Sequence, residues 1–258
     1  MKNMFNVLVI ILSFVVAFLF YYLILGNAAN FNDIDKHDPK TVLGTIYTGG
    51  PLVGILIGLL ILSITFVFER VLSISKARGK GNPDAYIKNL TELLAKGNMD
   101  EALTLCENQR GSLANVMRSA IARYKDVEND SDVSAEKKIG EVQRAIDEAM
   151  NLETPLLEKN LVILSTVASI STMVGLLGTT IGMIRAFKAL AAAGGAVSAT
   201  QLSIGISEAL WNTAGGLTAA IISIVAYNVF TTKVDNFVYM IDEAILSVTQ
   251  IFTIRVKK

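Results

Sequence analysis

Four apolar stretches, each long enough to cross a lipid bilayer, constrain this chain more than any other feature. They cover Val7–Leu25 and residues of about 46–68, 161–184 and 202–230. The hydrocarbon core of a bilayer is about 30 Å thick and is crossed by about 20 helical residues. Apolar runs of this length do not occur as surface helices of soluble domains, and no segment shows the alternation of a β-strand. The sequence therefore predicts an all-α, polytopic membrane protein with four transmembrane helices.

The composition excludes several classes of function. Charged residues make up only 18% of the chain and the net charge is zero, so nothing recruits nucleic acid. The single cysteine, Cys106, cannot form an internal disulfide, and the single histidine, His37, cannot build a His-rich metal site. No Ser/His/Asp or Cys/His set is available for catalysis. We therefore expect no enzyme, no cofactor and no bound metal.

The first apolar stretch has two interpretations. Lys2 precedes it and Gly26 to Ala28 follow it, which loosely resembles a cleaved signal peptide. Against cleavage, the stretch is longer than the usual apolar region of a signal peptide, and bulky aromatic side chains lie near its end. We expect an uncleaved membrane anchor.

Lysine and arginine set the expected topology. Most of the 23 basic residues lie in the segment 70–160, and more follow residue 232, whereas the loop 26–45 has few. Because cytoplasmic segments carry the excess of Lys and Arg, both termini and the segment 70–160 are expected in the cytoplasm. The expected order is an extra N-terminal anchor with a periplasmic loop (1–45), a transmembrane helix (46–70), a cytoplasmic helical domain (71–160), a channel-forming transmembrane hairpin (161–232) and a cytoplasmic C-terminal helix (233–258).

Helical spacing of apolar residues predicts four amphipathic helices in the cytoplasmic domain. Pro83 suits the first turn of one of them, and the last runs from about Ser134 to Glu158. Pro155 is expected to loosen this last helix just before the membrane.

Glu208 is the only carboxylate between Glu158 and Asp235, and it lies inside the fourth apolar stretch. A buried acid in lipid costs several kcal/mol and needs a partner, a proton or water, which marks it as a candidate ion-pathway residue. The alternative is that it caps the turn near the outer face.

Polar and small residues recur in the last two apolar stretches. Hydroxyls and amides that include Thr179, Asn212 and Thr213 intrude on the apolar background, which indicates a wet path, although each alone is compatible with simple packing. Glycines allow close approach between helices and between subunits. These are Gly175, Gly178, Gly182, Gly215 and Gly216.

Three stretches together carry a family resemblance. GLLGTTIGMIRAF (175–187), ISEALWNTAGGLTAAI (206–221) and YNVF (227–230) resemble the MotA/TolQ/ExbB proton-channel family, and its ExbB/TolQ branch fits best. The resemblance covers about residues 50–235. It implies that Glu208 is the family's membrane carboxylate, and that Thr179 and Thr213 line the channel.

The resemblance also implies partners. Family members form a homo-oligomer, a pentamer, around a dimer of an ExbD/TolR-like single-span protein in the bacterial inner membrane. Ion flow drives this motor, which acts on a TonB- or TolA-like protein. By this resemblance the chain is a proton-conducting subunit that energises TonB-dependent outer-membrane transport, surrounded by membrane lipid.

Departures from the family pattern keep other roles open. Thr180 and Asn212 stand where relatives carry apolar residues, and their oxygens are ligands that sodium prefers. Residues 1–25 add a span that shorter ExbB/TolQ proteins lack. A TolQ-like role in envelope integrity, sodium coupling, and a non-conducting scaffold for a single-span partner remain alternatives.

Overall fold

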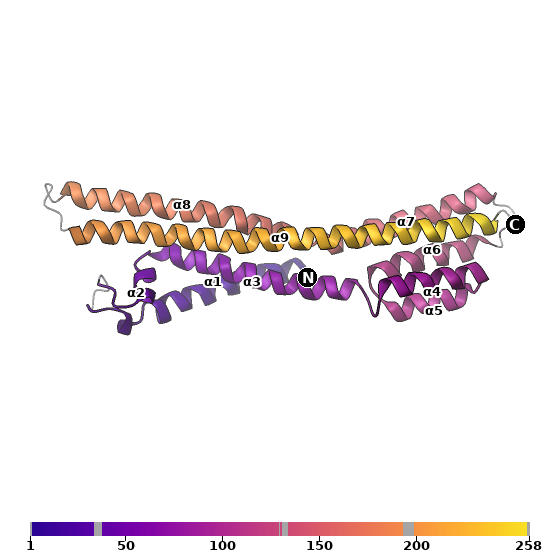
Figure 1. The fold of residues 1–258 in the computed structure, drawn as a ribbon, viewed down its shortest axis with the longest axis horizontal. Coiled ribbons are helices and arrows are strands. Elements are labelled where there is room, and N and C mark those ends of the chain that lie inside the picture. Colours follow the sequence, from indigo (N-terminus) through magenta and orange to yellow (C-terminus); the bar gives the residue numbers. More distant parts are fainter. Residues whose placement is uncertain (1, 34–37, 129, 131–133, 193–198, 257–258) are drawn as a thin grey trace. The chain divides into compact units, whose positions relative to one another are not determined.

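The computed structural model describes residues 2–33, 38–128, 130, 134–192 and 199–256 (Figure 1). His37 lies outside them. The described residues form α-helices, one π-helical turn and one 3₁₀ turn, and their only β pairing is an isolated bridge between Phe31 and Pro39. The elements are α1 (Lys2–Phe20), η1 (Tyr21–Leu25), η2 (Ala28–Asn30), α2 (Val42–Tyr47), α3 (Pro51–Ala77), α4 (Pro83–Lys96), α5 (Met99–Gln109), α6 (Ser112–Glu128), α7 (Ala135–Glu158), α8 (Leu161–Ala192) and α9 (Ala199–Val256).

Among the described residues, four helical stretches are long and apolar enough to cross a membrane, which confirms the all-helical class and agrees with the four expected spans. They begin at Asn6, Pro51, Ala135 and Leu202; the third includes the polar α7 before the apolar α8, and the fourth continues into polar sequence. The second apolar stretch begins with a separate short helix, because α2 ends at Tyr47 and Gly50 adopts a φ of 79° before α3 starts at Pro51. A left-handed φ of this kind favours glycine.

The chain divides into two compact units. The first contains residues 1–68 and 160–228, that is, α1, most of α3, all of α8 and the first half of α9. In this unit α1 packs closely on α3, because an added Cβ on Gly58 would lie 2.5 Å from the Phe14 ring, and one on Gly54 would lie 2.9 Å from the Phe18 ring. The hydroxyls of Ser63 and Ser223 are hydrogen-bonded and fully buried, which joins α3 to α9.

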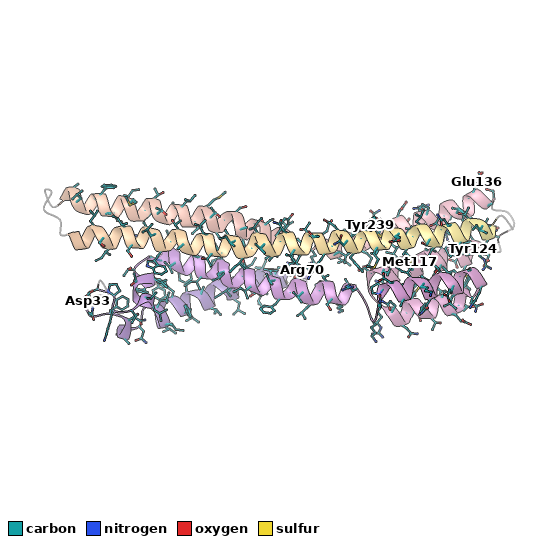
Figure 2. All side chains as sticks on the ribbon, in the orientation of Figure 1. Asp33, Arg70, Met117, Tyr124, Glu136 and Tyr239 are labelled. Atoms are coloured by element: carbon teal, nitrogen blue, oxygen red, sulfur yellow. The ribbon has the colours of Figure 1, made fainter. Side chains whose placement is uncertain are left out.

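The second unit contains residues 69–159 and 229–258. Helices α4 to α7 and the end of α9 share a core in which Met117, Ile121, Ile146 and Phe252 are at most 1% exposed. The rings of Tyr124, labelled in Figure 2, and Phe252 are stacked with centroids 4.1 Å apart.

Local signals set the ends of the helices in this unit. The Asn82 side chain accepts a hydrogen bond from the Asp84 backbone N–H, and Pro83 occupies the first helical position of α4, as expected from the sequence. Gly97 ends the same helix with a φ of 88°, and Ser134 caps α7.

Arg70 is the largest fully buried polar side chain of the described residues (Figure 2). Its guanidinium makes two hydrogen bonds to the neighbouring Glu69 carboxylate, at 2.7 and 2.8 Å, and a third to the Leu157 carbonyl oxygen, at 3.1 Å. A buried charge needs such partners, and the fork of an arginine can satisfy a carboxylate and a carbonyl together. This contact links the end of α3 to the end of α7.

The interruption between α7 and α8 lies after Pro155. Helix α7 continues through this proline to Glu158, and Asn160 then adopts a left-handed φ of 64°. Asparagine tolerates this region better than most residues. The Asn6 side-chain amide donates to the Asn160 side-chain oxygen at 2.8 Å, which ties the start of α1 to the start of α8 within the first unit.

Candidate functional site

Helices α8 and α9 lie side by side in the first unit, and small residues at their contact allow the close approach (Figure 1). An added Cβ on Gly178 would lie 2.4 Å from the Asn212 Cβ, and one on Gly182 would lie 2.9 Å from the Ala209 Cβ. Gly175 and Gly216 approach one another in the same way, with 3.2 Å from an added Gly175 Cβ to the Gly216 Cα. At these positions the backbones of α8 and α9 approach closely, which small residues permit.

Gly215 differs from the other four glycines. It is half-buried, and an added Cβ would lie 3.4 Å from the Leu56 side chain of α3, which is ordinary contact distance. Its surroundings would accept a methyl group.

Thr179 and Thr213 face each other across the α8–α9 contact, where their hydroxyls are hydrogen-bonded. Both hydroxyls also lie near the Gly175 carbonyl oxygen, at 3.2 Å for Thr179 and 3.4 Å for Thr213. Both side chains are half-buried. The pair therefore places two hydroxyls and one carbonyl together inside a membrane helix contact.

Asn212 lies one residue from that pair and is 1% exposed. Its amide donates to the Gly49 carbonyl oxygen at 2.9 Å and to the Glu208 carbonyl oxygen at 3.1 Å. Its side-chain oxygen has no hydrogen-bond donor among the described residues. The first bond links α9 to the turn that precedes α3.

Glu208 is paired with an arginine. The Arg185 Nη1 lies 2.5 Å from the Glu208 Oε1, and the Glu208 side chain is only 12% exposed against 58% for Arg185. Gly50 closes over the pair, since a Cβ on it would lie 3.3 Å from the same carboxylate oxygen. A carboxylate inside a membrane needs a partner, and Arg185 provides one.

The structure thus places Glu208, Asn212, Thr213 and Thr179 along the α8–α9 contact and leaves Thr180 outside it. The Thr180 hydroxyl donates to the Leu176 carbonyl oxygen of its own helix, and its side chain is exposed. Among the described residues no group of three or more His, Cys, Asp or Glu side chains is placed to hold a metal ion.

Sequence reasoning missed Arg185 and the 49–50 turn as parts of this cluster. A signal for Arg185 was present, because it lies about as many residues before the end of α8 as Glu208 lies after the start of α9. Residues at matched distances from the ends of two antiparallel helices lie at a similar depth. No comparable signal connects Asn212 to Gly49, because that contact depends on how the turn before α3 folds.

The sequence pattern of the MotA/TolQ/ExbB proton channel family matches residues 108–243. This range contains the end of α5, all of α6 to α8 and most of α9, and therefore every residue of the cluster except the 49–50 turn.

Curated relatives are also similar to part of the chain. The Tol-Pal system protein TolQ of Haemophilus influenzae is 42% identical over 116 residues, which are 44% of this chain and 48% of that protein. TolQ of Pseudomonas aeruginosa is 36% identical over 118 residues, 46% of this chain and 51% of that protein. The biopolymer transport protein ExbB of Helicobacter pylori is 41% identical over 88 residues, 34% of this chain and 58% of that protein. The matches span about half the length of these relatives.

Proposed function

Because the chain belongs to the MotA/TolQ/ExbB proton channel family, we propose that it is the ion-conducting subunit of a motor in the bacterial inner membrane. The motor is of the ExbB–ExbD or TolQ–TolR type. In it a homo-oligomer, a pentamer, surrounds a single-span partner, and the proton motive force energises TonB-dependent outer-membrane transport. One observation carries the proposal: the sole carboxylate of the last two spans pairs with Arg185 across the same α8–α9 contact at which the Thr179 and Thr213 hydroxyls are hydrogen-bonded.

The cluster has the chemistry that an ion pathway needs. Glu208 offers a titratable group, and Thr179 and Thr213 offer hydroxyls that both donate and accept hydrogen bonds. A proton can pass along such groups only if water or a partner's side chain completes the chain of hydrogen bonds between them. The carboxylate of a single-span partner, docked against the threonine pair, would supply that missing group.

Replacement of Glu208 tests ion conduction. Glu208→Gln keeps the size and hydrogen-bonding capacity of the side chain but removes its charge and titration, and Glu208→Ala removes all of them. We expect both variants to assemble normally and to abolish growth on a nutrient whose uptake needs a TonB-type system. Asp235→Asn, an exposed acid further along α9, is the matched control and should grow normally.

Normal growth of the glutamine variant would contradict ion conduction through Glu208. It would instead favour the alternative that the protein is a non-conducting membrane scaffold for a single-span partner. Size-exclusion chromatography of each variant in detergent separates loss of assembly from loss of conduction.

A TolQ-like role in envelope integrity is the second candidate, because both of the TolQ relatives match a longer part of this chain than the ExbB of Helicobacter pylori does. Deletion of the gene distinguishes the two roles. A TonB-type defect appears as poor growth on a scarce nutrient, whereas a Tol-type defect appears as sensitivity to detergents and leakage of periplasmic proteins.

Sodium is the alternative coupling ion. The unpaired side-chain oxygen of Asn212 favours a cation, while Thr180 lies away from the cluster and adds nothing to it. Function that persists with a protonophore and stops when sodium is replaced by potassium would identify sodium coupling.

A further inference from the structure

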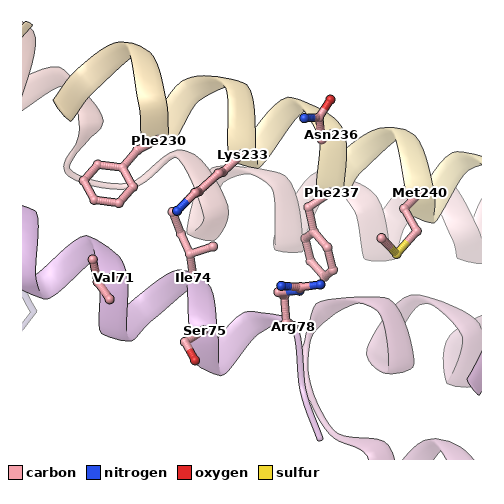
Figure 3. Close-up of a pocket in the computed structure, with 9 residues that line it drawn as sticks. All are labelled: Val71, Ile74, Ser75, Arg78, Phe230, Lys233, Asn236, Phe237 and Met240. Atoms are coloured by element: carbon pink, nitrogen blue, oxygen red, sulfur yellow. The ribbon is translucent and has the colours of Figure 1, made fainter. Parts of the chain in front are cut away.

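A cavity of about 380 Å³ lies in the second unit, between the end of α3 and the part of α9 that begins at Phe230 (Figure 3). Its volume is in the range of small-molecule sites. Apolar side chains form most of its wall: Val71 and Ile74 from α3, and Phe230, Phe237 and Met240 from α9.

Two basic side chains, Arg78 and Lys233, line this mostly apolar cavity. Lys233 reaches from α9 toward α3, and the Arg78 guanidinium lies below the Phe237 ring (Figure 3). No aspartate or glutamate is among the residues that line the cavity. Among the described residues neither cation forms an ion pair, although the Lys233 ammonium lies 5.9 Å from the centre of the Phe230 ring. The cavity therefore attracts a ligand that is anionic at one end and apolar at the other.

The position along the chain indicates where such a ligand comes from. The apolar run of α3 ends at Phe68, and the next turn still exposes apolar side chains, with Val71 49% and Leu72 72% exposed. Arg78 follows the last residue of α3, and Lys233 lies on α9 three residues after Phe230, where the fourth apolar stretch ends. With the expected topology, the cavity opens at the cytoplasmic boundary of the membrane. Basic pockets between transmembrane helices on the cytoplasmic side are suited to the headgroups of anionic phospholipids.

We propose that this cavity binds one anionic phospholipid of the cytoplasmic leaflet. Its phosphate lies between Arg78 and Lys233, and its acyl chains run along the exposed apolar surface at Val71. Arginine and lysine both bind phosphate well, one as a planar fork and the other as a compact charge. This site is separate from the proposed ion pathway, and of the earlier expectations the proposal uses only the topology.

Removal of the two cations is the first test. The probes are phosphatidylglycerol and the zwitterionic phosphatidylethanolamine, added to the detergent-purified full chain and counted by native mass spectrometry. We expect R78Q/K233Q to weaken phosphatidylglycerol binding about thirtyfold and to leave phosphatidylethanolamine binding unchanged. K76Q/K80Q is the matched control, because it removes two exposed charges from the same region outside the cavity. Equal lipid binding by both double variants would overturn the proposal.

Filling the cavity is the second test, and it keeps both cations. Val71→Trp places an indole in the apolar wall and should displace phosphatidylglycerol, whereas Leu72→Trp, on the exposed neighbouring position outside the lining, should not. Binding that survives Val71→Trp would contradict the proposal. This pair remains informative if the double cation variant fails to fold.

Two further outcomes would overturn the proposal by assigning the cavity to another occupant. If inorganic phosphate is the ligand, phosphate alone will raise the melting temperature as much as phosphatidylglycerol does. If an acidic surface of a second copy fills the cavity, R78Q/K233Q will dissociate the oligomer while K76Q/K80Q will not. Glu208→Gln should bind phosphatidylglycerol like the unmodified protein, so failure of the ion pathway and failure of this site are distinguishable.

Discussion

At the residue scale, Arg185 changes the chemistry expected of Glu208. The sequence presents one acid inside a membrane, and the structure presents an ion pair covered by Gly50. An acid held by an arginine must exchange this partner for another before it can pass a proton. Glu208 is therefore both a structural partner and a candidate ion-pathway residue, and its two roles can be separated by experiment.

A double-mutant cycle separates them. We expect Arg185→Gln to destabilise the protein by about 1–3 kcal/mol, less than the roughly 3–5 kcal/mol of a fully buried pair because Arg185 is 58% exposed. R185Q/E208Q should regain most of this stability, since no charge is left without a partner, but it should remain inactive. Thermal unfolding in detergent measures the first effect and growth measures the second. A double variant no more stable than Arg185→Gln would show that the pair contributes nothing.

Cys106 provides a residue-scale prediction outside the membrane. Its thiol is 2% exposed, and burial raises its pKa even though the Tyr86 hydroxyl hydrogen-bonded to the sulfur lowers it. We expect thiol reagents at pH 8 to label the native protein about 100-fold more slowly than the unfolded chain, because the thiolate is the reactive form.

The same shift sets a pH dependence. The folded thiol holds its proton more tightly than the unfolded thiol, whose pKa is about 8.5. Its contribution to stability is complete below that pH and is lost as the pH rises through the folded pKa. Cys106→Ala should therefore reduce the loss of melting temperature between pH 7.5 and about pH 10, compared with the unmodified protein.

At the element scale, two glycines in long helices have opposite surroundings. An added Cβ on Gly178 would overlap Asn212, whereas nothing lies within 4 Å of one on Gly140 in α7. We expect Gly178→Ala to destabilise by about 1–3 kcal/mol through overpacking. Gly140→Ala should stabilise by about 0.5–1 kcal/mol, because alanine loses less backbone freedom in a helix. Thermal unfolding of both variants measures the difference, and equal effects would argue against the close α8–α9 contact.

Much of the element scale could be predicted from the sequence. Apolar length identifies the four spans, and Asn82–Pro83, Gly97 and Ser134 mark helix ends through chemistry that acts within a few residues. Pro155 was a poor guide to the end of α7. The sequence predicted that it loosens the helix, but α7 continues through it to Glu158, and the break comes at Asn160, which adopts a left-handed φ.

Contacts between distant elements were beyond sequence reasoning. The hydrogen bond between Ser63 and Ser223 and the bond from Asn212 to Gly49 join residues about 160 positions apart. Their formation depends on the rotation and depth of each helix, which apolar periodicity fixes only to within about a turn. The polar residues of the cluster could be named in advance, but their partners could not.

At the scale of the whole molecule, the topology and the oligomer are still predictions. A reporter inserted in the loop 26–45 and one inserted after Lys125 should lie on opposite sides of the inner membrane, because Lys and Arg are concentrated after the second span. The same side for both would contradict the expected topology. Native mass spectrometry should find five copies, with Thr179 and Thr213 inside the ring, and cysteines introduced at these positions should cross-link to a partner helix rather than react with lipid-soluble reagents.

The pairing of Arg185 with Glu208 also has a consequence for biogenesis. A charged residue in the middle of a membrane helix opposes its transfer from the translocon to lipid by about 2.5–3.5 kcal/mol, and near a helix end by less. Helix α8 carries the arginine and α9 carries the glutamate. The nascent chain reaches its lowest free energy if the two helices leave the translocon together as a hairpin with the charges already matched. A ribosome stalled between the synthesis of α8 and α9 should therefore leave α8 bound at the translocon longer in the native sequence than in Arg185→Leu.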